Sequence, residues 1–161
     1  MSKTRGPPPR RLRSASPTFE EAALASICMQ VPLDVPAAVA WDALRDWGAL
    51  HERLAPGFAT DVRVEGEDRV VTFFTGAALR ERIIAVDDEN RRLAWSIVDG
   101  PYAHHNGGAT IREADRGCVF EWITDLLPHA AEEQTRAMME RALAVIKQTL
   151  ESRDEVDAVV G

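Results

Sequence analysis

The sequence predicts an α+β domain in which a curved, seven-stranded antiparallel sheet wraps around one long C-terminal helix. Three observations predict this fold class. A strand pattern near the N-terminus is followed by two short helical patterns. Six further strand patterns come next, and short polar turns separate them in pairs. The last pattern, residues 130–153, is amphipathic and contains neither glycine nor proline.

The first strand is expected at residues 23–31, where apolar residues alternate with others until Pro32. A helix is expected at 36–47, because Pro36 suits a first helical turn and apolar residues then recur every three or four positions. These apolar residues are Val39, Ala40, Ala43, Leu44 and Trp47. A second short helix is expected at residues 49–54, before a proline and a glycine.

Six strands are expected in the middle of the chain. They lie at residues 60–65, 69–74, 78–86, 92–98, 102–113 and 118–127. Turn-forming residues at 66–68, 87–90 and 115–117 separate them in pairs. Because turns this short join antiparallel neighbours, the six strands are expected to form a meander.

The final helix is the only predicted element long enough to cover the apolar face of this sheet. About 24 helical residues span roughly 36 Å. A strongly curved sheet closed by one helix leaves space that side chains do not fill. We therefore expect an apolar pocket between sheet and helix, a common kind of site for a small ligand.

Charge is distributed unevenly along the chain. The 161 residues include 19 basic and 26 acidic residues, which gives a net charge of −7. Five of the basic residues lie within residues 1–13, so the rest of the chain has 14 basic and 26 acidic residues, or −12. The folded domain is therefore not expected to bind nucleic acid or an anionic membrane.

Three segments are expected. Residues 1–19 are basic, rich in proline and poor in apolar residues, which predicts a disordered arm. The arm is either a plain tail or an electrostatic contact for RNA, lipid or an acidic partner. Residues 20–153 form the folded domain, and residues 154–161 form a C-terminal tail.

Several classes of site are not expected. No apolar run approaches the roughly 20 residues that cross a bilayer, and no apolar stretch follows the basic N-terminus as in a secretory signal. This favours a cytoplasmic location. Cys28 and Cys118 lack C-x-x-C spacing, and the four histidines lack the convergent spacing of metal ligands. We expect no metal and no cofactor.

Common catalytic motifs are absent, and the most unusual polar cluster is His104, His105 and Asn106. Adjacent side chains of a strand point to opposite faces, so one histidine is expected to face the pocket. Alternation along the strand favours His105, although a bulge at Gly107 would reverse the phase. With a pKa near 6.5, such a histidine moves a proton or donates to a ligand carbonyl. The alternative is a strand-end histidine bonded to a loop.

Charged residues begin the predicted strand 78–86. Glu81 is on one face, and Arg80 and Arg82 are on the other; both faces then become apolar, so periodicity does not show which face points inward. A buried Glu81 would serve as an acid or base. The alternative is a solvated strand end with cross-strand ion pairs.

Aromatic and methionine side chains are candidates for the pocket wall. Trp95 and Trp122 share strand faces with apolar residues and are expected to point inward, either to stack on a planar ligand or simply to fill the core. At least one of Phe73 and Phe74 should line the core. The predicted ligand-binding residues are Phe73, Arg80, Trp95, His104, Asn106, Trp122, Met138 and Ala142. The catalytic candidates, if the protein is an enzyme, are His105 and Glu81.

Three stretches carry a resemblance to a known superfamily. They read VPLDVPAAVAWDALRDWGALHERLAPG, LRERIIAVDDENRRLAWSIVDG and GCVFEWITDLLP, and the long final helix follows them. In order and spacing, residues 22–152 resemble the SRPBCC or START-like helix-grip superfamily, which includes Bet v 1-like and polyketide cyclase/dehydrase proteins. The resemblance implies a helix-grip fold with a hydrophobic pocket. It does not imply one activity, because the superfamily includes lipid carriers, hormone receptors, cyclases and chaperone regulators.

The expected function is to bind a small hydrophobic or aromatic metabolite, of polyketide or lipid type, in this cavity. The alternative is a polyketide cyclase or dehydratase in which His105 or Glu81 assists enolisation while Arg80 or Arg82 steadies an enolate oxygen. Binding is favoured because no pair of catalytic residues has a clear spacing. The expected partner is a small hydrophobic molecule, and a homodimer is left open.

Overall fold

The computed structural model describes residues 25–160, with side chains to residue 153, and confirms the predicted α+β fold. The predicted arm, residues 1–19, lies outside the described residues. The strands are β1 (Ala25–Leu33), β2 (Ala59–Glu65), β3 (Asp68–Phe73), β4 (Ala78–Asp87), β5 (Arg92–Asp99), β6 (His104–Glu113) and β7 (Cys118–Leu127). The helices are α1 (Ala37–Arg45) and α2 (Glu132–Val160), with short helical turns η1 (Trp47–Ala49), η2 (Leu50–Leu54) and η3 (His129–Ala131).

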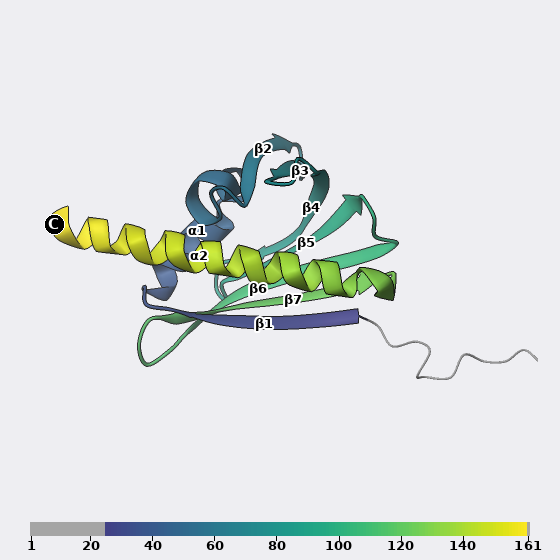
Figure 1. The fold of residues 1–161 in the computed structure, drawn as a ribbon. Helices are drawn as coiled ribbons and strands as arrows, with labels where there is room; N and C mark the ends of the chain where they lie inside the picture. The colour runs from purple at the N-terminus through teal and green to yellow at the C-terminus, as the bar shows by residue number, and fades with distance from the viewer. Residues whose placement is uncertain (1–24, 161) are drawn as a thin grey trace, which may run out of the picture.

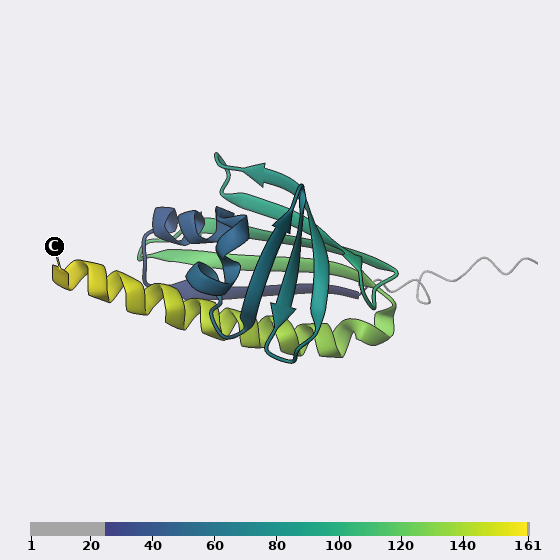
Figure 2. The same ribbon diagram turned by 90° about the horizontal axis from the view of Figure 1, so that it is seen from above.

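The seven strands form one antiparallel sheet in the order β1-β7-β6-β5-β4-β3-β2. Strands β2 to β7 are a meander, as the short turns predicted, and β1 joins the edge beside β7. The sheet twists strongly: β1, β6 and β7 run along α2, whereas β2, β3 and β4 turn across it (Figure 2).

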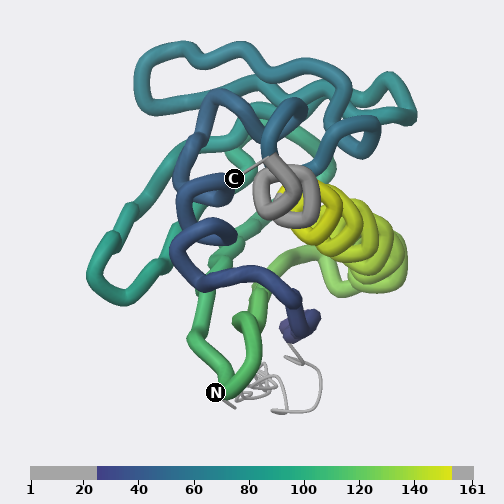
Figure 3. The backbone as a smooth tube through the Cα atoms, turned by 90° about the vertical axis from the view of Figure 1, so that its left-hand side faces the viewer, coloured from purple at the N-terminus to yellow at the C-terminus, as the bar shows by residue number. Residues whose placement is uncertain are grey.

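Helix α2 lies across the concave face of the sheet (Figure 1) and contacts β1. Near the C-terminal half of α2, α1 and the short turns after it occupy the remaining space on this face (Figure 3), and η2 contacts α2. The main core cluster joins buried residues of α1, β5, β6, β7 and α2. Among the described residues, no helix combines the length and the apolarity that a membrane span requires.

Strand β1 does not end at Pro32 as expected but continues to Leu33. Pro32 is tolerated because β1 is an edge strand that pairs with β7 alone. Its carbonyl oxygen accepts a hydrogen bond from Lys147 Nζ on α2, at 2.8 Å. The carbonyl and the missing N–H of one residue point to the same side of a strand, so Pro32 removes no bond to β7.

The helices also differ from expectation. In α1 the buried aromatic residue is Trp41, whose indole Nε1 donates to Asp88 Oδ1 at 3.0 Å, while Val39 is exposed. Helix α2 continues to Val160 instead of ending at residue 153.

Two turn glycines with nearly equal backbone angles allow a matched test of packing. Gly66 has a φ of 66° and open space where a Cβ would lie, whereas Gly117 has a φ of 68° and its Cβ would lie 2.0 Å from the Leu33 carbonyl oxygen. Gly66→Ala should lower the free energy of unfolding by about 1 kcal/mol, the cost of a left-handed alanine. Gly117→Ala should cost at least about 2 kcal/mol more, because the backbone of β1 has to move. Urea unfolding of both variants measures the difference, and equal losses would contradict the close approach of β1 to this turn.

Candidate functional site

The described residues line a partly open cavity of about 310 Å³ between the concave face of the sheet and α2. Its wall is largely apolar and is formed by strands β3 to β7, by α1 and η2, and by α2. The polar wall includes Asp46, Arg69, Glu81 and His105. The space is therefore the pocket that the curvature of the predicted sheet implied.

Most predicted site residues line this cavity. They are Phe73, Glu81, Trp95, His105, Trp122, Met138 and Ala142. Three predicted ligand-binding residues do not line it: Arg80, His104 and Asn106. Strand alternation explains the last two, because β6 turns His105 inward and leaves His104 exposed and Asn106 half-buried on the other face.

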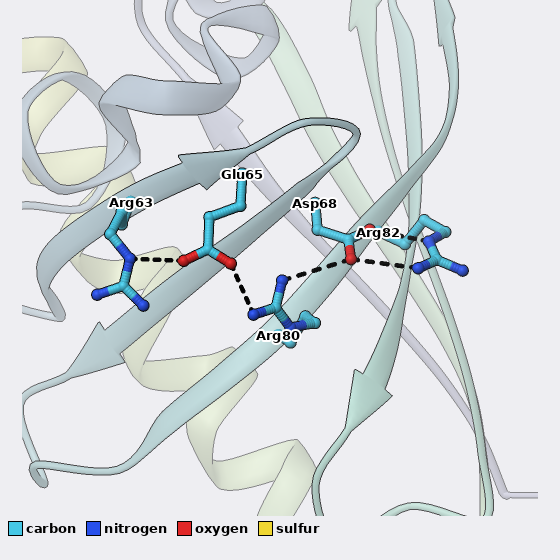
Figure 4. A network of polar contacts seen from close by, with 5 residues as sticks. All are labelled: Arg63, Glu65, Asp68, Arg80 and Arg82. Atoms are coloured by element: carbon cyan, nitrogen blue, oxygen red, sulfur yellow. Dashed lines mark hydrogen bonds and ion pairs between the residues drawn. The ribbon is translucent and has the colours of Figure 1, made fainter.

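Arg80 belongs to a network of charges at the β2–β3–β4 end of the sheet, and its predicted place in the pocket was wrong (Figure 4). Its Nη2 lies 2.7 Å from Glu65 Oε2, and Asp68 also accepts a hydrogen bond from Arg82 Nε at 2.8 Å. The Arg82 and Arg80 guanidinium groups lower the pKa of Asp68. These are the cross-strand ion pairs that the sequence offered as the alternative, and they occupy the arginines that were considered for steadying an enolate.

Glu81 takes the opposite position and is buried against a residue that the sequence analysis did not single out. Its Oε2 accepts from Arg69 Nε at 2.8 Å and lies 2.6 Å from Arg69 Nη2, and both side chains are less than a tenth exposed. Arg69 Nη1 also donates to the Trp47 carbonyl oxygen at 2.8 Å, and the guanidinium lies 3.5 Å from the centre of the Trp47 ring. The Arg69 guanidinium is therefore held by the Glu81 carboxylate on one side and by Trp47 on the other.

A signal for Arg69 was present in the sequence. Arg69 has the same strand parity as Val71 and Phe73, both of which the structure places on the inner side. In the β3–β4 hairpin Arg69 pairs directly with Glu81. A charged pair at opposed inward positions of one hairpin is a typical buried ion pair.

His105 is held by the neighbouring strand. Its Nδ1 accepts a hydrogen bond from the backbone N–H of Ile97 at 3.2 Å, which requires that Nδ1 carry no proton, so the neutral ring is protonated on Nε2. Burial, with a smaller contribution from the neighbouring His104, lowers the pKa of His105 from 6.5 to about 4. The pKa near 6.5 expected for a pocket histidine was wrong, because burial of the ring disfavours its charged form.

Two tryptophans shape the middle of the wall. The Trp95 and Trp122 rings lie 5.8 Å apart at an angle of 54°. Trp95 packs directly on Gly107, where a Cβ would lie 2.7 Å from the indole. The absence of a side chain at Gly107 therefore leaves room for the Trp95 ring. Gly107 is not the site of a bulge, because β6 pairs with β7 without a register shift.

Two enclosed polar atoms of the wall have no hydrogen-bond partner among the described residues: Trp122 Nε1 and Thr124 Oγ1. Leaving such a donor unpaired costs about 1–3 kcal/mol. Other polar wall groups are paired; the Tyr102 and Thr135 hydroxyls lie 2.9 Å apart, for example. Strand alternation places Thr124 on the same face of β7 as Trp122, but it does not show that the hydroxyl lacks a partner, since this depends on the opposite wall.

A family model described as polyketide cyclase / dehydrase and lipid transport matches residues 25–151. The chain belongs to this family. The match confirms the resemblance that the three sequence stretches carried, and it spans every strand of the sheet and most of α2.

The chain is also similar to a plant protein in sequence and to solved structures in fold. MLP-like protein 423 of Arabidopsis thaliana is 30% identical over 109 residues, which cover 58% of this chain and 70% of that protein. An uncharacterised protein of a Bacillus thuringiensis crystal structure has a TM-score of 0.71 at 14% identity, covering 78% of this chain and 98% of that one. Norcoclaurine synthase of Thalictrum flavum, in complex with dopamine and hydroxybenzaldehyde, has a TM-score of 0.62 at 16% identity, covering 90% and 95%. At such identities the two structures show a shared fold.

The buried environment of His105 is testable by titration. The pKa of His105 is near 6.5 in the unfolded chain and about 4 in the folded protein. Between these two pH values the unfolded state therefore binds more protons than the folded state. The free energy of unfolding should therefore fall as the pH drops from 6.5 to 4, by about 3 kcal/mol in total from this group. His105→Asn, whose side-chain oxygen can still accept from Ile97, should remove this part of the pH dependence.

The measurement combines urea unfolding across this pH range with NMR of the imidazole protons. The imidazole resonance that disappears in His105→Asn should titrate with a midpoint near pH 4. A midpoint near 6.5 for that resonance would show that the ring is solvated.

Proposed function

We propose that the protein binds a small hydrophobic or aromatic metabolite in the cavity between the sheet and α2. The observation that supports this most directly is the cavity itself, whose volume of about 310 Å³ is in the range of small-molecule sites and whose wall is mainly apolar. Burial of apolar ligand surface would supply most of the binding free energy.

The charged side chains of the cavity wall are paired, which supports ligand binding rather than catalysis. Glu81 is paired with Arg69, and Asp46 is 2.8 Å from Arg53. With its pKa lowered to about 4, His105 is neutral at neutral pH. The wall thus offers an uncharged, apolar environment, which favours a neutral ligand over an ion.

The tilted rings of Trp95 and Trp122 favour a flat ligand. Both indoles line the cavity, and an aromatic face beside them would gain stacking beyond the burial of its area. Met138 on α2 adds an adaptable side chain to the wall. We also propose that the protein acts in the cytoplasm, where the free thiols of Cys28 and Cys118 would remain reduced.

Filling the cavity from α2 tests the proposal. Ala142 is buried and lines the cavity, whereas Ala144, two residues further along α2, is exposed. Ala142→Phe should weaken binding of the neutral fluorescent probe N-phenyl-1-naphthylamine at least roughly tenfold, because the added ring takes the volume that the probe needs. Ala144→Phe adds the same ring outside the cavity and should leave the affinity unchanged.

Fluorescence titration measures the affinities, and far-ultraviolet circular dichroism confirms that both variants are folded. Equal binding to the native protein and to a folded Ala142→Phe variant would show that the probe sits elsewhere. No binding to the native protein would count against a binding function for this cavity.

A second candidate function is a cyclase or dehydratase that acts on a poly-β-carbonyl substrate, with Glu81 or His105 as acid or base. It is favoured by the fact that both side chains line the cavity, and norcoclaurine synthase is an example of an enzyme with this fold. It is weakened by the pairing of Glu81 with Arg69 and of His105 Nδ1 with Ile97. Turnover of a synthetic poly-β-ketone that falls in His105→Asn and in Glu81→Gln, while its affinity is retained, would support the enzyme.

A further inference from the structure

A glycine lies on the concave face of β6 at a position whose backbone does not require one. Gly107 is in an interior strand, which pairs with β5 on one side and with β7 on the other. It is not among the described glycines that have a positive φ, and its pairs with Trp95 and Thr124 follow the register without a bulge. A glycine in the interior of a strand weakens the strand, and it often marks a place where another group approaches closely.

The group that approaches Gly107 is the indole of Trp95. The two residues are direct partners, and they form the last pair between β5 and β6. A Cβ at position 107 would lie 2.7 Å from Cε2 and 2.8 Å from Cζ2 of the indole. Carbon atoms in van der Waals contact are about 3.5–4.0 Å apart. The indole therefore occupies the space that a side chain at this position would take.

The surroundings of the indole direct any displacement into the cavity. The backbone of β6 beneath it is held by pairing with strands on both sides. The Trp122 ring lies beside it, with the two ring centres 5.8 Å apart. Trp95 itself lines the cavity and retains 7% of its accessible surface. A side chain at position 107 would therefore push the indole away from the sheet, into the volume that a ligand needs.

We infer that Gly107 is a specificity-determining residue: by letting the Trp95 indole lie against the sheet, it sets the size of the ring system that the cavity accepts. This inference rests on the proposed binding function and deepens it, because it names the pair of residues by which the cavity selects apolar ligands by size. A larger ring system needs the indole against the sheet, whereas a smaller one fits in either case. The glycine weakens β6 but leaves this volume to the ligand.

The alternative is that the indole over Gly107 serves packing alone. An aromatic ring that covers a glycine of the neighbouring strand stabilises a sheet with or without a ligand. A loss of stability in Gly107→Ala follows from both explanations and does not separate them. The test therefore measures the ratio of the affinities for two ligands of different size, which packing alone does not change.

Naphthalene and phenanthrene are flat, uncharged hydrocarbons that differ by one fused ring. The native protein should bind phenanthrene more tightly, because phenanthrene buries more apolar surface. Gly107→Ala should weaken binding of phenanthrene at least roughly tenfold and binding of naphthalene less than roughly threefold. Gly108→Ala is the matched control. Its Cβ would point to the opposite face of β6, where the nearest atoms lie 3.7 and 4.0 Å away, so this variant should keep the native ratio.

A second substitution shows whether Gly107 acts through the indole. Leucine at position 95 lacks the three ring atoms that a Cβ at position 107 would meet, which are Cε2, Cζ2 and Nε1. In a Trp95→Leu background, Gly107→Ala should therefore change the ratio of the two affinities less than roughly twofold. An equally large change of the ratio in this background would show that the alanine acts through the backbone of β6, which overturns the inference.

Equilibrium dialysis, with each hydrocarbon quantified by its own fluorescence, measures the affinities, and far-ultraviolet circular dichroism confirms that the variants are folded. If Gly107→Ala does not fold, Trp95→Leu alone decides the question: removal of the indole should raise the preference for phenanthrene, and an unchanged preference overturns the inference. The native ratio in a folded Gly107→Ala variant also overturns it and leaves the binding function intact. Failure of both hydrocarbons to bind the native protein counts against the binding function itself.

Discussion

The rest of this structure depends on one constraint: a straight helix packs against a strongly twisted sheet. Helix α2 can pack along β1, β6 and β7, which run beside it, but β2, β3 and β4 turn away across it. Helix α1 and the turns after it cover part of the remaining face. Even the large side chains of Phe73, Trp95 and Trp122 leave a space of about 310 Å³. The cavity is thus a geometric result of the twist.

Inside this cavity, polar groups fall into two kinds. Glu81 and Arg69 satisfy each other, and Arg69 is further held by the Trp47 carbonyl and ring. Breaking one partner of such a buried pair costs several kcal/mol, so this pair fixes β3 against β4 and η1. Trp122 and Thr124 have no such partners among the described residues. The first kind stabilises the fold, while the second lowers its stability.

Much of the fold, and the inward direction of several site residues, could be predicted from the sequence, because both depend on local patterns. Alternation within one strand was enough to predict that His105 and Trp95 point inward. It was not enough for Arg80 or Glu81, since both faces of β4 begin with charge, and the outcome depends on the pairing of Glu81 with Arg69 across the hairpin. The lowered pKa of His105 also required non-local knowledge, namely how deeply its ring is buried once the chain has folded.

Thr124 shows that a buried position of this fold is not filled by the residue that would stabilise it most. It pairs with Ile27 of β1 on one side and with Gly107 of β6 on the other, and its side chain is buried. Valine would supply the same volume without an unpaired hydroxyl, so folding alone favours valine here. The Thr124 hydroxyl therefore costs stability at a position where valine would pack equally well.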